Sequence, residues 1–461
     1  MKPFNLQTAA DWCGGKIVGG DSQMNVTAVT TDTRAIKGGE LFVALVGERF
    51  DAHDFLAEAA SKGAVAALVS RVPEGFDQGA VGLALVLVDD TLSGLQDLAR
   101  NYRSLLDPLV VAVTGSNGKT STKDLLAAVL GTKYKVHATP GNLNNHIGLP
   151  LTLLSTPEDT TCVICEIGMS NPGEIAPLAE IARPDISVIT NVGTAHIEFM
   201  GSREAIALEK GMLAEAVGSD GFVILNSTDD YSQSIADRTE AKVIMAGVEA
   251  GEVRAEQVAG SGAGSVFTLT DEEHSAEVDL PVPGIHMVGN ATLAAAAALS
   301  AGADLASVAD ALTKAKLTGG RLQRVKVAGL DVVDDSYNAN PDSVKAAIVT
   351  LEGLPCNGRR IAVLGRMAEL GAGAKQAHAD VGLFAAEHGV DELISVGAID
   401  APDITIAASV AGMGEHALHF DTAAECAGHL ASSATPEDLI LVKGSRSSRM
   451  EAVLEQLSTN R

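Results

Sequence analysis

Short apolar runs alternate with longer amphipathic stretches along most of the chain. The first quarter has apolar runs, typical of strands, at 27–31, 40–45, 65–69 and 83–88. Helical stretches lie between and after these runs, at 55–62 and 91–106. Further apolar runs, again separated by helical stretches, follow at 109–113, 162–167, 186–191, 222–225 and 242–245. This alternation predicts mostly parallel sheets, with ligands at the carboxyl ends of the strands.

The pattern changes in the second half of the chain. From 251 to 282 the apolar positions become short and alternating, with Gly-Ser-Gly-Ala-Gly at 260–264, and this favours a β-hairpin over further crossover units. An alanine-rich helix is expected at 291–301. After Gly319 and Gly320 a second doubly wound unit is expected. Its strands are predicted at 331–334, 361–364, 392–396 and 439–442.

These elements predict an α/β protein of three domains. A small amino-terminal α/β domain is expected at 1–90 and a central domain with a parallel P-loop sheet at 91–318. A Rossmann-like carboxyl-terminal domain is expected at 319–461. The length of 461 residues fits about three domains.

Charge and composition limit the kinds of molecule that the chain is expected to bind. The chain has 59 acidic and 33 basic residues, a formal charge of −26, which repels nucleic acid and anionic membranes. An anionic substrate must therefore be held by cations placed locally. The amino-terminal segment lacks an apolar signal core, and no apolar run reaches the ~18 residues of a membrane helix. We expect a soluble, cytoplasmic protein without membrane insertion.

The cysteines favour a reducing compartment. The chain has five cysteines, an odd and small number that argues against a disulfide framework. Cys162 and Cys165 have CxxC spacing, but they lie in an apolar, strand-like run without a second pair. We therefore expect buried core thiols there and not a zinc site.

The strand at 109–113 runs into a glycine turn followed by a helix, which is expected from Thr122 onward. The turn reads Gly115-Ser116-Asn117-Gly118-Lys119-Thr120-Ser121. In such a turn backbone N–H groups approach phosphates, a lysine supplies a point charge and a hydroxyl coordinates Mg²⁺, here Lys119 and Thr120. The strict Walker pattern has glycine where this chain has Val113. The loop is thus a shortened variant, which argues against ordinary GTPases.

Two polar residues follow other predicted strands of the same sheet. Glu166 ends the strand at 162–167, where a carboxylate can bind Mg²⁺ directly or through water. His196 follows the strand at 186–191 and could reach the same metal region. A lone histidine is more often a structural hydrogen-bonding residue, so His196 by itself is a weak signal.

The phosphate loop, Glu166, His196 and a lysine in Ala207-Leu208-Glu209-Lys210-Gly211 together resemble the Mur ligase family of ATP-dependent amide-forming enzymes. The resemblance spans nearly the whole chain and implies ATP and Mg²⁺. Family members phosphorylate a substrate carboxylate, and an amine then displaces the phosphate. The lysine matching Lys210 is carbamylated in the family. The resemblance implies catalytic roles for Lys119, Lys210, His196 and Glu166, and metal binding by Thr120, Glu166, His196 and Lys210.

Other segments are similar to the family member that joins D-alanyl-D-alanine to UDP-N-acetylmuramoyl-tripeptide. Segments 30–34 and 39–45 resemble the domain that holds the UDP end of that substrate, and 141–150 resembles a substrate loop. Segments 335–341 and 443–446 resemble carboxyl-terminal signatures. The substrate-binding residues implied are Thr33, Arg34, Asn142, Asn145, Asn338 and Asn340. We expect a monomer that binds both substrates.

The resemblance also implies contacts with the nucleotide. Asn290 matches the asparagine against adenine, Arg321 the arginine that swings onto the nucleotide, and Asp335 the partner of the ribose. Met287 stands where many members have a second asparagine. Arg366 stands where an acidic residue is more usual, and this puts an acidic role there in doubt. For Arg324 and Glu369 a surface or capping role stays open.

Other functions remain to be weighed. The rivals are another Mur-type ligase, a folylpolyglutamate synthetase, and a nucleotide-binding switch or scaffold without amide chemistry. Segment 335–340 and the loop with Asn142 and Asn145 weigh against the first two. A switch would bind nucleotide without ADP formation that depends on both acceptor substrates. The sequence leaves open whether the third residue of the tripeptide is meso-diaminopimelate or lysine.

Overall fold

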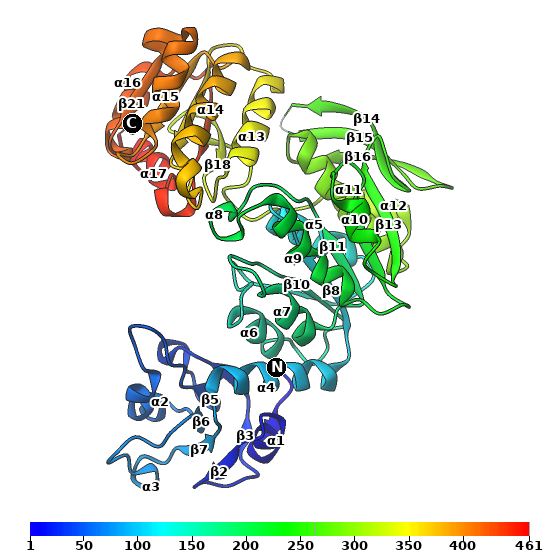
Figure 1. The fold of residues 1–461 in the computed structure, drawn as a ribbon, viewed down its shortest axis with the longest axis vertical. Helices are drawn as coiled ribbons and strands as arrows, with labels where there is room; N and C mark the ends of the chain where they lie inside the picture. The colour runs from blue at the N-terminus through cyan, green and yellow to red at the C-terminus, as the bar shows by residue number, and fades with distance from the viewer. Residues whose placement is uncertain (263, 461) are drawn as a thin grey trace. The chain divides into compact units, whose positions relative to one another are not determined.

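The chain folds into two units, which are described separately. The computed structural model describes residues 1–262 and 264–460. The first unit comprises Met1–Ala112, Lys133–Met169 and Gly173–Ile186. The second comprises Val113–Thr132, Ser170–Pro172 and Ser187–Arg461. Figure 1 shows the elements coloured along the chain.

The start of the first unit is a small α/β fold, as expected. Its sheet has the strand order β2-β7-β6-β5-β4, in which β4 to β7 run parallel and β2 is antiparallel to β7. The strands are β2 (Lys16–Val18), β4 (Ala28–Thr30), β5 (Glu40–Val43), β6 (Ala66–Val69) and β7 (Ala84–Leu87). The sequence did not predict the short pair β1 (Phe4–Asn5) and β3 (Asn25–Val26), nor α1 (Leu6–Trp12).

Helices cover this sheet on the side of its apolar core. Phe42, Leu56, Val69 and Leu85 belong to one buried cluster, which joins the strands to α2 (Leu56–Ser61). The short α3 spans Gln78–Val81. Helix α4 (Thr91–Leu106) begins where the sequence predicts, because the Asp90 side chain caps it by accepting from the Ser93 N–H at 2.7 Å.

The rest of the first unit contains the parallel pair β9 (Val136–Ala138) and β10 (Cys162–Glu166), with α6 (Gly148–Leu154) and α7 (Ile175–Ala182). Cys162 and Cys165 lie on β10, and both are fully buried and free. Burial raises the pKa of each thiol to about 12. The interpretation of this CxxC as core thiols is confirmed.

Strand β8 (Leu109–Thr114) runs from the first unit into the second and leads to α5 (Lys119–Leu130). The expected helix start at Thr122 is wrong by three residues. Gly118, at φ 82°, is the N-cap, so helical geometry begins at Lys119. Only a residue that tolerates positive φ can end the turn this early, and glycine does so without a steric cost.

The second unit continues the alternation of strands and helices. Strands β12 and β13 pair in parallel, as do β13 and β14. The elements in chain order are β11 (Ile186–Ile189), α8 (Ile197–Met200), α9 (Arg203–Glu215), β12 (Phe222–Asn226), α10 (Ser232–Ala236) and β13 (Lys242–Val248).

The segment predicted as a β-hairpin is a three-stranded antiparallel excursion. It consists of β14 (Val253–Ser261), β15 (Gly264–Thr270) and β16 (Ser275–Leu280). Helix α11 (Ile285–Ser300) follows and begins six residues before the expected 291. Its N-cap is Gly284, at φ 105°, so the first turns are built from non-alanine residues that the alanine pattern did not reveal. Helix α12 (Leu305–Thr313) completes this region.

The carboxyl-terminal part is doubly wound, as expected. Its strand order is β17-β18-β22-β19-β20-β21, and only β17 is antiparallel to its neighbour among the described strands of this sheet. The strands are β17 (Gln323–Val327), β18 (Leu330–Asp335), β19 (Arg360–Gly365), β20 (Glu392–Val396), β21 (Ala417–Phe420) and β22 (Leu439–Lys443). The helices are α13 (Pro341–Gly353), α14 (Ala374–Glu387), α15 (Pro402–Ala408), α16 (Ala423–Ser433) and α17 (Glu451–Asn460).

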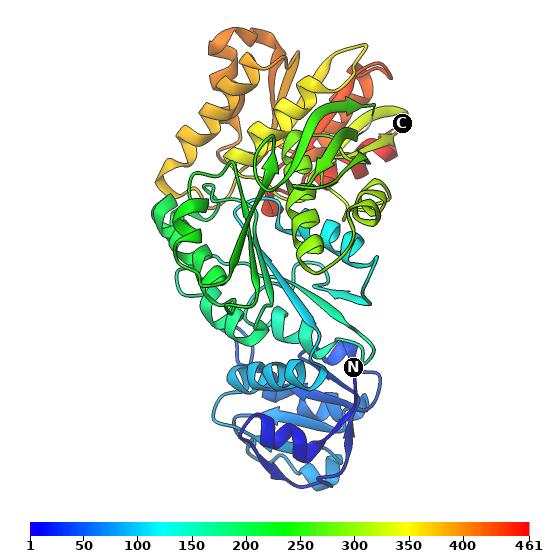
Figure 2. The ribbon, with the colours of Figure 1, turned by 90° about the vertical axis from the view of Figure 1, so that its right-hand side faces the viewer.

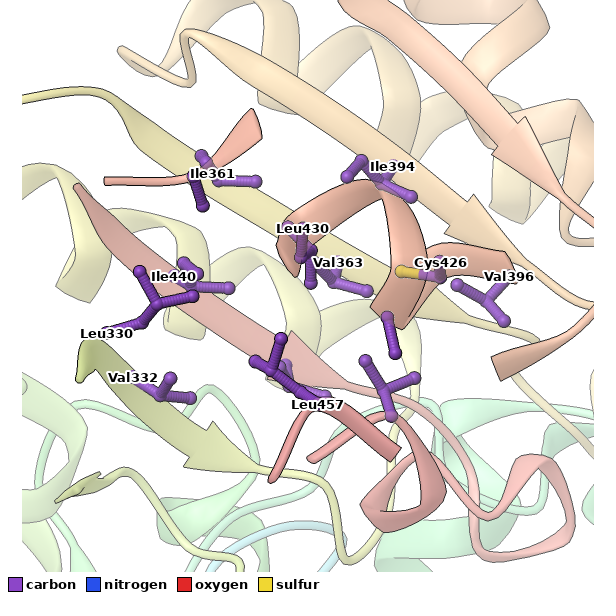
Figure 3. Packing of buried hydrophobic residues seen from close by; sticks show 14 of the residues in the cluster. Leu330, Val332, Ile361, Val363, Ile394, Val396, Cys426, Leu430, Ile440 and Leu457 are labelled. Atoms are coloured by element: carbon purple, nitrogen blue, oxygen red, sulfur yellow. The ribbon is translucent and has the colours of Figure 1, made fainter. Parts of the chain in front are cut away.

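One face of this sheet packs against α16 and α17. Figure 3 shows the cluster: Val332, Val363 and Ile440 from the strands meet Leu430 of α16 and Leu457 of α17. Figure 2 shows the same ribbon from a second direction. In the described part of the chain, no helix is long and apolar enough to cross a membrane.

The buried cluster gives a stability prediction. Replacing Leu430, which is fully buried, by alanine (Leu430→Ala) should lower the free energy of unfolding by about 2–5 kcal/mol, because a cavity replaces the lost contacts. Urea unfolding followed by circular dichroism measures the change. The matched control is Ile406→Ala, since Ile406 is 59% exposed. Equal shifts for the two variants would contradict the packing described here.

Candidate functional site

The phosphate loop, residues 115–118, packs so closely on its neighbours that two of its positions admit only glycine. A Cβ on Gly115 would lie 1.8 Å from Oγ1 of Thr190. A Cβ on Gly118, at φ 82°, would lie 2.7 Å from Oδ1 of Asn290 on α11. The loop therefore presents its backbone directly at the start of α5, where N–H groups and the helix dipole favour anions.

The loop is also fixed by the segment after β11, which we call the histidine loop, residues 191–196. The Ser116 N–H donates to the Asn191 carbonyl at 2.9 Å, and the Asn117 N–H donates to Asn191 Oδ1 at 3.0 Å. The Gly193 N–H donates to Ser116 Oγ at 2.8 Å. Sequence reasoning missed the anchoring role of Asn191, although Asn191 lies at the end of the strand predicted at 186–191.

Two lysines meet near the phosphate loop. Lys119 Nζ donates to the carbonyl of Gly115 at 2.7 Å, while Thr120 and Ser121 are buried at the start of α5. Lys210 on α9 is 1% exposed. Burial, and then the nearby Lys119 ammonium, lower the pKa of Lys210 well below its ordinary value. Lys210 is thus held toward its neutral amine form.

His196 contacts a residue of the carboxyl-terminal part. Its Nδ1 lies 2.6 Å from Oε2 of Glu369. Both residues have left-handed backbone conformations, with φ 62° each. His196, and to a smaller degree Lys119, lower the pKa of Glu369. Glu369 thus has a direct partner in His196, while its site role stays open and the metal role of His196 stays a prediction.

Glu166 ends β10 in the first unit with a buried side chain. Its Oε1 accepts from Asn144 Nδ2 at 2.8 Å, and within the described residues its buried Oε2 has no hydrogen-bond partner. Gly168 leaves the room for Asn144, since a Cβ there would lie 2.9 Å from its side chain. Sequence reasoning missed Asn144. The sequence signal for Asn144 was the group of asparagines within 142–145, in which the prediction named the neighbours Asn142 and Asn145.

These side chains can be tested against Mg²⁺. Across residues 1–262 and 264–460, no group of three or more His, Cys, Asp or Glu side chains is arranged to hold a metal. Mg²⁺ keeps several waters and takes few protein ligands beside the phosphates of a nucleotide. In the first unit the orphaned oxygen of Glu166 suits that chemistry, and in the second unit the buried hydroxyl of Thr120 does.

The substrate candidates of the first unit are mostly exposed. Arg34 pairs with Asp32 at 2.8 Å, and its side chain is 86% exposed. Thr33 Oγ1 donates to Glu58 at 2.9 Å. Asn142 is exposed, whereas Asn145 Oδ1 accepts from the N–H of Gly148, the first residue of α6.

Two nucleotide candidates, Asp335 and Arg321, and the substrate candidate Asn338 lie in or near β17 and β18. Asp335 Oδ2 accepts from Lys443 Nζ at 2.6 Å, and burial raises the pKa of Asp335 although Lys443 opposes this. The Arg321 guanidinium lies 4.3 Å from the centre of the Tyr337 ring. Asn338 is exposed, with Oδ1 accepting from the Arg446 N–H at 3.2 Å.

Asn340 and Asn290 have structural contacts in addition to their predicted roles. Asn340 caps α13 and donates from Nδ2 to Asn117 Oδ1 at 2.8 Å. Asn290 packs on Gly118 and donates to the Met287 sulfur at 3.7 Å. Their contacts with dipeptide and adenine stay predictions.

Two arginines named from the sequence form ion pairs. Arg324 makes a forked contact with Asp331 on the neighbouring strand, which favours the structural role that the sequence left open. Arg366 Nε donates to Asp400 Oδ2 at 2.8 Å. The basic residue at position 366 is thus neutralised by a nearby acid.

Comparisons with known proteins agree along the whole chain. Three family models match: the Mur ligase family catalytic domain at 25–103, the Mur ligase middle domain at 113–298, and the Mur ligase glutamate ligase domain at 320–446. The chain is 38% identical over 437 residues to the UDP-N-acetylmuramoyl-tripeptide--D-alanyl-D-alanine ligase of Bacillus subtilis (strain 168), which covers 94% of each chain.

Solved structures are also similar. A crystal structure of MurF from Acinetobacter baumannii matches with a TM-score of 0.91 and 31% identity, covering 100% of this chain and 99% of that chain. MurF from Thermotoga maritima in complex with ADP matches with a TM-score of 0.84 and 29% identity, covering 94% and 97%. The expected three-domain α/β fold is confirmed by this likeness, while the boundaries at 90 and 318 stay predictions.

The close packing at Gly118 gives a prediction for nucleotide binding. Gly118→Ala should weaken ADP binding about ten-fold or more, because the positive φ and the contact with Asn290 both oppose a methyl group. Calorimetric titration with ADP measures the change. Gly218→Ala is the control, since a Cβ there meets nothing within 4 Å. An unchanged ADP affinity in Gly118→Ala would show that the loop does not hold the nucleotide.

Proposed function

The chain belongs to the Mur ligase family, and on that premise we propose that it is an ATP-dependent ligase that adds D-alanyl-D-alanine to UDP-N-acetylmuramoyl-tripeptide. The products are the pentapeptide precursor of peptidoglycan, ADP and phosphate. The full-length likeness to ligases of this name supports the choice of substrates. The structural observation that supports the proposal is the geometry of the phosphate loop. Its glycines allow the loop backbone to lie directly against Thr190 and Asn290.

Different groups of the loop have different roles in phosphoryl transfer. The N–H groups at the start of α5 hold the phosphates, and Lys119 offsets the charge of the transferring group. The resulting acyl phosphate is attacked by the amine of the dipeptide. Mg²⁺, when bound, supplies further charge neutralisation, and its proposed ligands are Thr120, Glu166, His196 and Lys210.

Lys210 would bind Mg²⁺ in the form of a carbamate. An ammonium has three donors and no acceptor, so an unmodified lysine cannot ligate metal. The depressed pKa of Lys210 supplies the neutral amine. Its lone pair adds to the carbon of CO₂, a proton leaves, and the product is an anion with two oxygens. Such an anion suits Mg²⁺ and also places a negative charge in the surroundings of Lys119.

The three predicted domains receive separate roles. Residues 1–90 bind the UDP end of the substrate through Thr33 and Arg34, and residues 91–318 bind ATP. Residues 319–461 bring the dipeptide to the acyl phosphate and exclude water, with Asn338 and Asn340 on the dipeptide and Arg321 and Asp335 on the nucleotide. We propose a soluble, cytoplasmic monomer.

Phosphate release tests the function directly. The chain should release phosphate only when ATP, a UDP-N-acetylmuramoyl-tripeptide and D-alanyl-D-alanine are all present. Single amino acids offered as the amine test the other Mur-type ligases and the folylpolyglutamate type. Mass spectrometry of the product from each tripeptide identifies the third residue. Release that does not require the dipeptide would reject the proposal.

The carbamate gives a further prediction. With ¹³CO₂ the wild type should show a carbamate carbon signal that Lys210→Ala lacks, and this variant should lose amide formation while ATP binding is largely kept. Lys375→Ala is the control, because Lys375 is an exposed lysine of α14. Near-normal activity in Lys210→Ala, or no signal in the wild type during turnover, would refute the role of Lys210.

A further inference from the structure

The histidine loop is also held by the first turn of α13. Oδ2 of Asp342 accepts two hydrogen bonds from Thr194, one from its N–H at 2.9 Å and one from its Oγ1 at 2.9 Å. The two residues are 148 positions apart in the sequence. A single carboxylate oxygen thus fixes both the backbone and the side chain of the residue two positions before His196.

The backbone of the histidine loop is shaped to admit this carboxylate. A Cβ at Gly193 would lie 2.6 Å from Oδ2 of Asp342 and 3.4 Å from Nδ2 of Asn117. Real Cβ atoms do not approach an oxygen to 2.6 Å, so any other residue at 193 would push Asp342 or the loop away. Gly193 also donates its N–H to Ser116 Oγ. The same glycine therefore faces the phosphate loop and the carboxylate.

A second contact comes from the same helical turn. Asn340 is the N-cap of α13, Pro341 follows it, and the Asn340 side chain donates to Asn117 of the phosphate loop at 2.8 Å. The capping bonds with Ser343 fix the direction of that side chain. One rigid turn thus holds the phosphate loop through Asn340 and the histidine loop through Asp342.

We propose that Asp342 is a positioning residue, which sets the histidine loop, and with it His196, against the phosphate loop. The proposal rests on the proposed ligase function, which gives His196 and the phosphate loop their chemical roles. Asp342 does not act on substrate or nucleotide itself. Its effect reaches the reaction through Thr194, so it should govern turnover and not the binding of nucleotide.

The chain supplies a matched control for the presence of an acid in the first turn of a helix. Helix α15 also begins with a Pro-Asp pair, Pro402 and Asp403. An acid in this position interacts favourably with the helix dipole in both helices. Asp403→Ala therefore removes a dipole contribution without touching Thr194, whereas Asp342→Ala also removes the two bonds to Thr194.

Hydrogen exchange tests the contact without reference to catalysis. The Thr194 amide should exchange several-fold faster in Asp342→Ala than in the wild type, and Asp403→Ala should leave it unchanged. The measurement uses mass spectrometry of peptides that span residues 191–197 in the full chain, with and without ADP. Equal exchange in wild type and Asp342→Ala would overturn the proposal.

Kinetics then test the effect on the reaction. Asp342→Ala should lower kcat about ten-fold while the KM for ATP changes less than about two-fold, because two hydrogen bonds that orient the loop are lost. Asp342→Asn keeps one acceptor oxygen and should recover part of kcat, and Thr194→Ser keeps both donors and should resemble the wild type. A fall in kcat no larger than that of Asp403→Ala, or no recovery in Asp342→Asn, would overturn the proposal.

The two proposals fail in different ways. If the wild type releases no phosphate with D-alanyl-D-alanine, the proposed function fails, and the exchange measurement still decides whether Asp342 holds the histidine loop. If the wild type is active and Asp342→Ala retains full kcat, only the positioning role fails. Circular dichroism of each variant shows whether the fold is kept, and Asp342→Asn replaces Asp342→Ala if the alanine variant unfolds.

Discussion

The close approach of the phosphate loop to Thr190 and Asn290 is the constraint on which the rest of the site depends. Gly115 and Gly118 have no side chains, so the loop backbone lies where any Cβ would overlap these neighbours. The approach fixes the start of α5 at Lys119, and the first N–H groups of a helix lie at the positive end of its dipole. An anion-binding end thus results from packing, before any charged side chain contributes.

Charge around this loop must be arranged locally, because the chain as a whole is strongly acidic. Lys119 stays close to the loop by donating to the Gly115 carbonyl. A second ammonium beside it, buried on α9, would be costly, and the pKa of Lys210 falls accordingly. The same burial that makes Lys210 a poor cation makes it a good nucleophile. The lowered pKa of Lys210 is therefore a consequence of the burial and charge around it.

The sequence could predict those parts of the fold and site that local patterns determine. Apolar runs located the strands, and the glycine turn before Lys119 located the phosphate loop. The helix start at 119 was missed, because a helical N-cap at Gly118 depends on its φ. Asn191 and Asp342 were missed as contacts for a different reason. Their partners, Asn117 and Thr194, lie 74 and 148 residues away in the sequence. The periodicity of apolar and polar residues does not indicate contacts over such distances.

The pair of His196 and Glu369 shows how contacts between distant loops stabilise unusual local structure. Each residue has φ 62°, a conformation that costs a non-glycine residue about 1–2 kcal/mol. Their side chains meet at 2.6 Å, and the lowered pKa of Glu369 shows that its charged form is favoured there. A carboxyl with a lowered pKa stabilises the folded state above its unfolded pKa, and this contribution is lost as pH falls through the folded pKa. Acidification should therefore weaken the contact of Glu369 with the histidine loop.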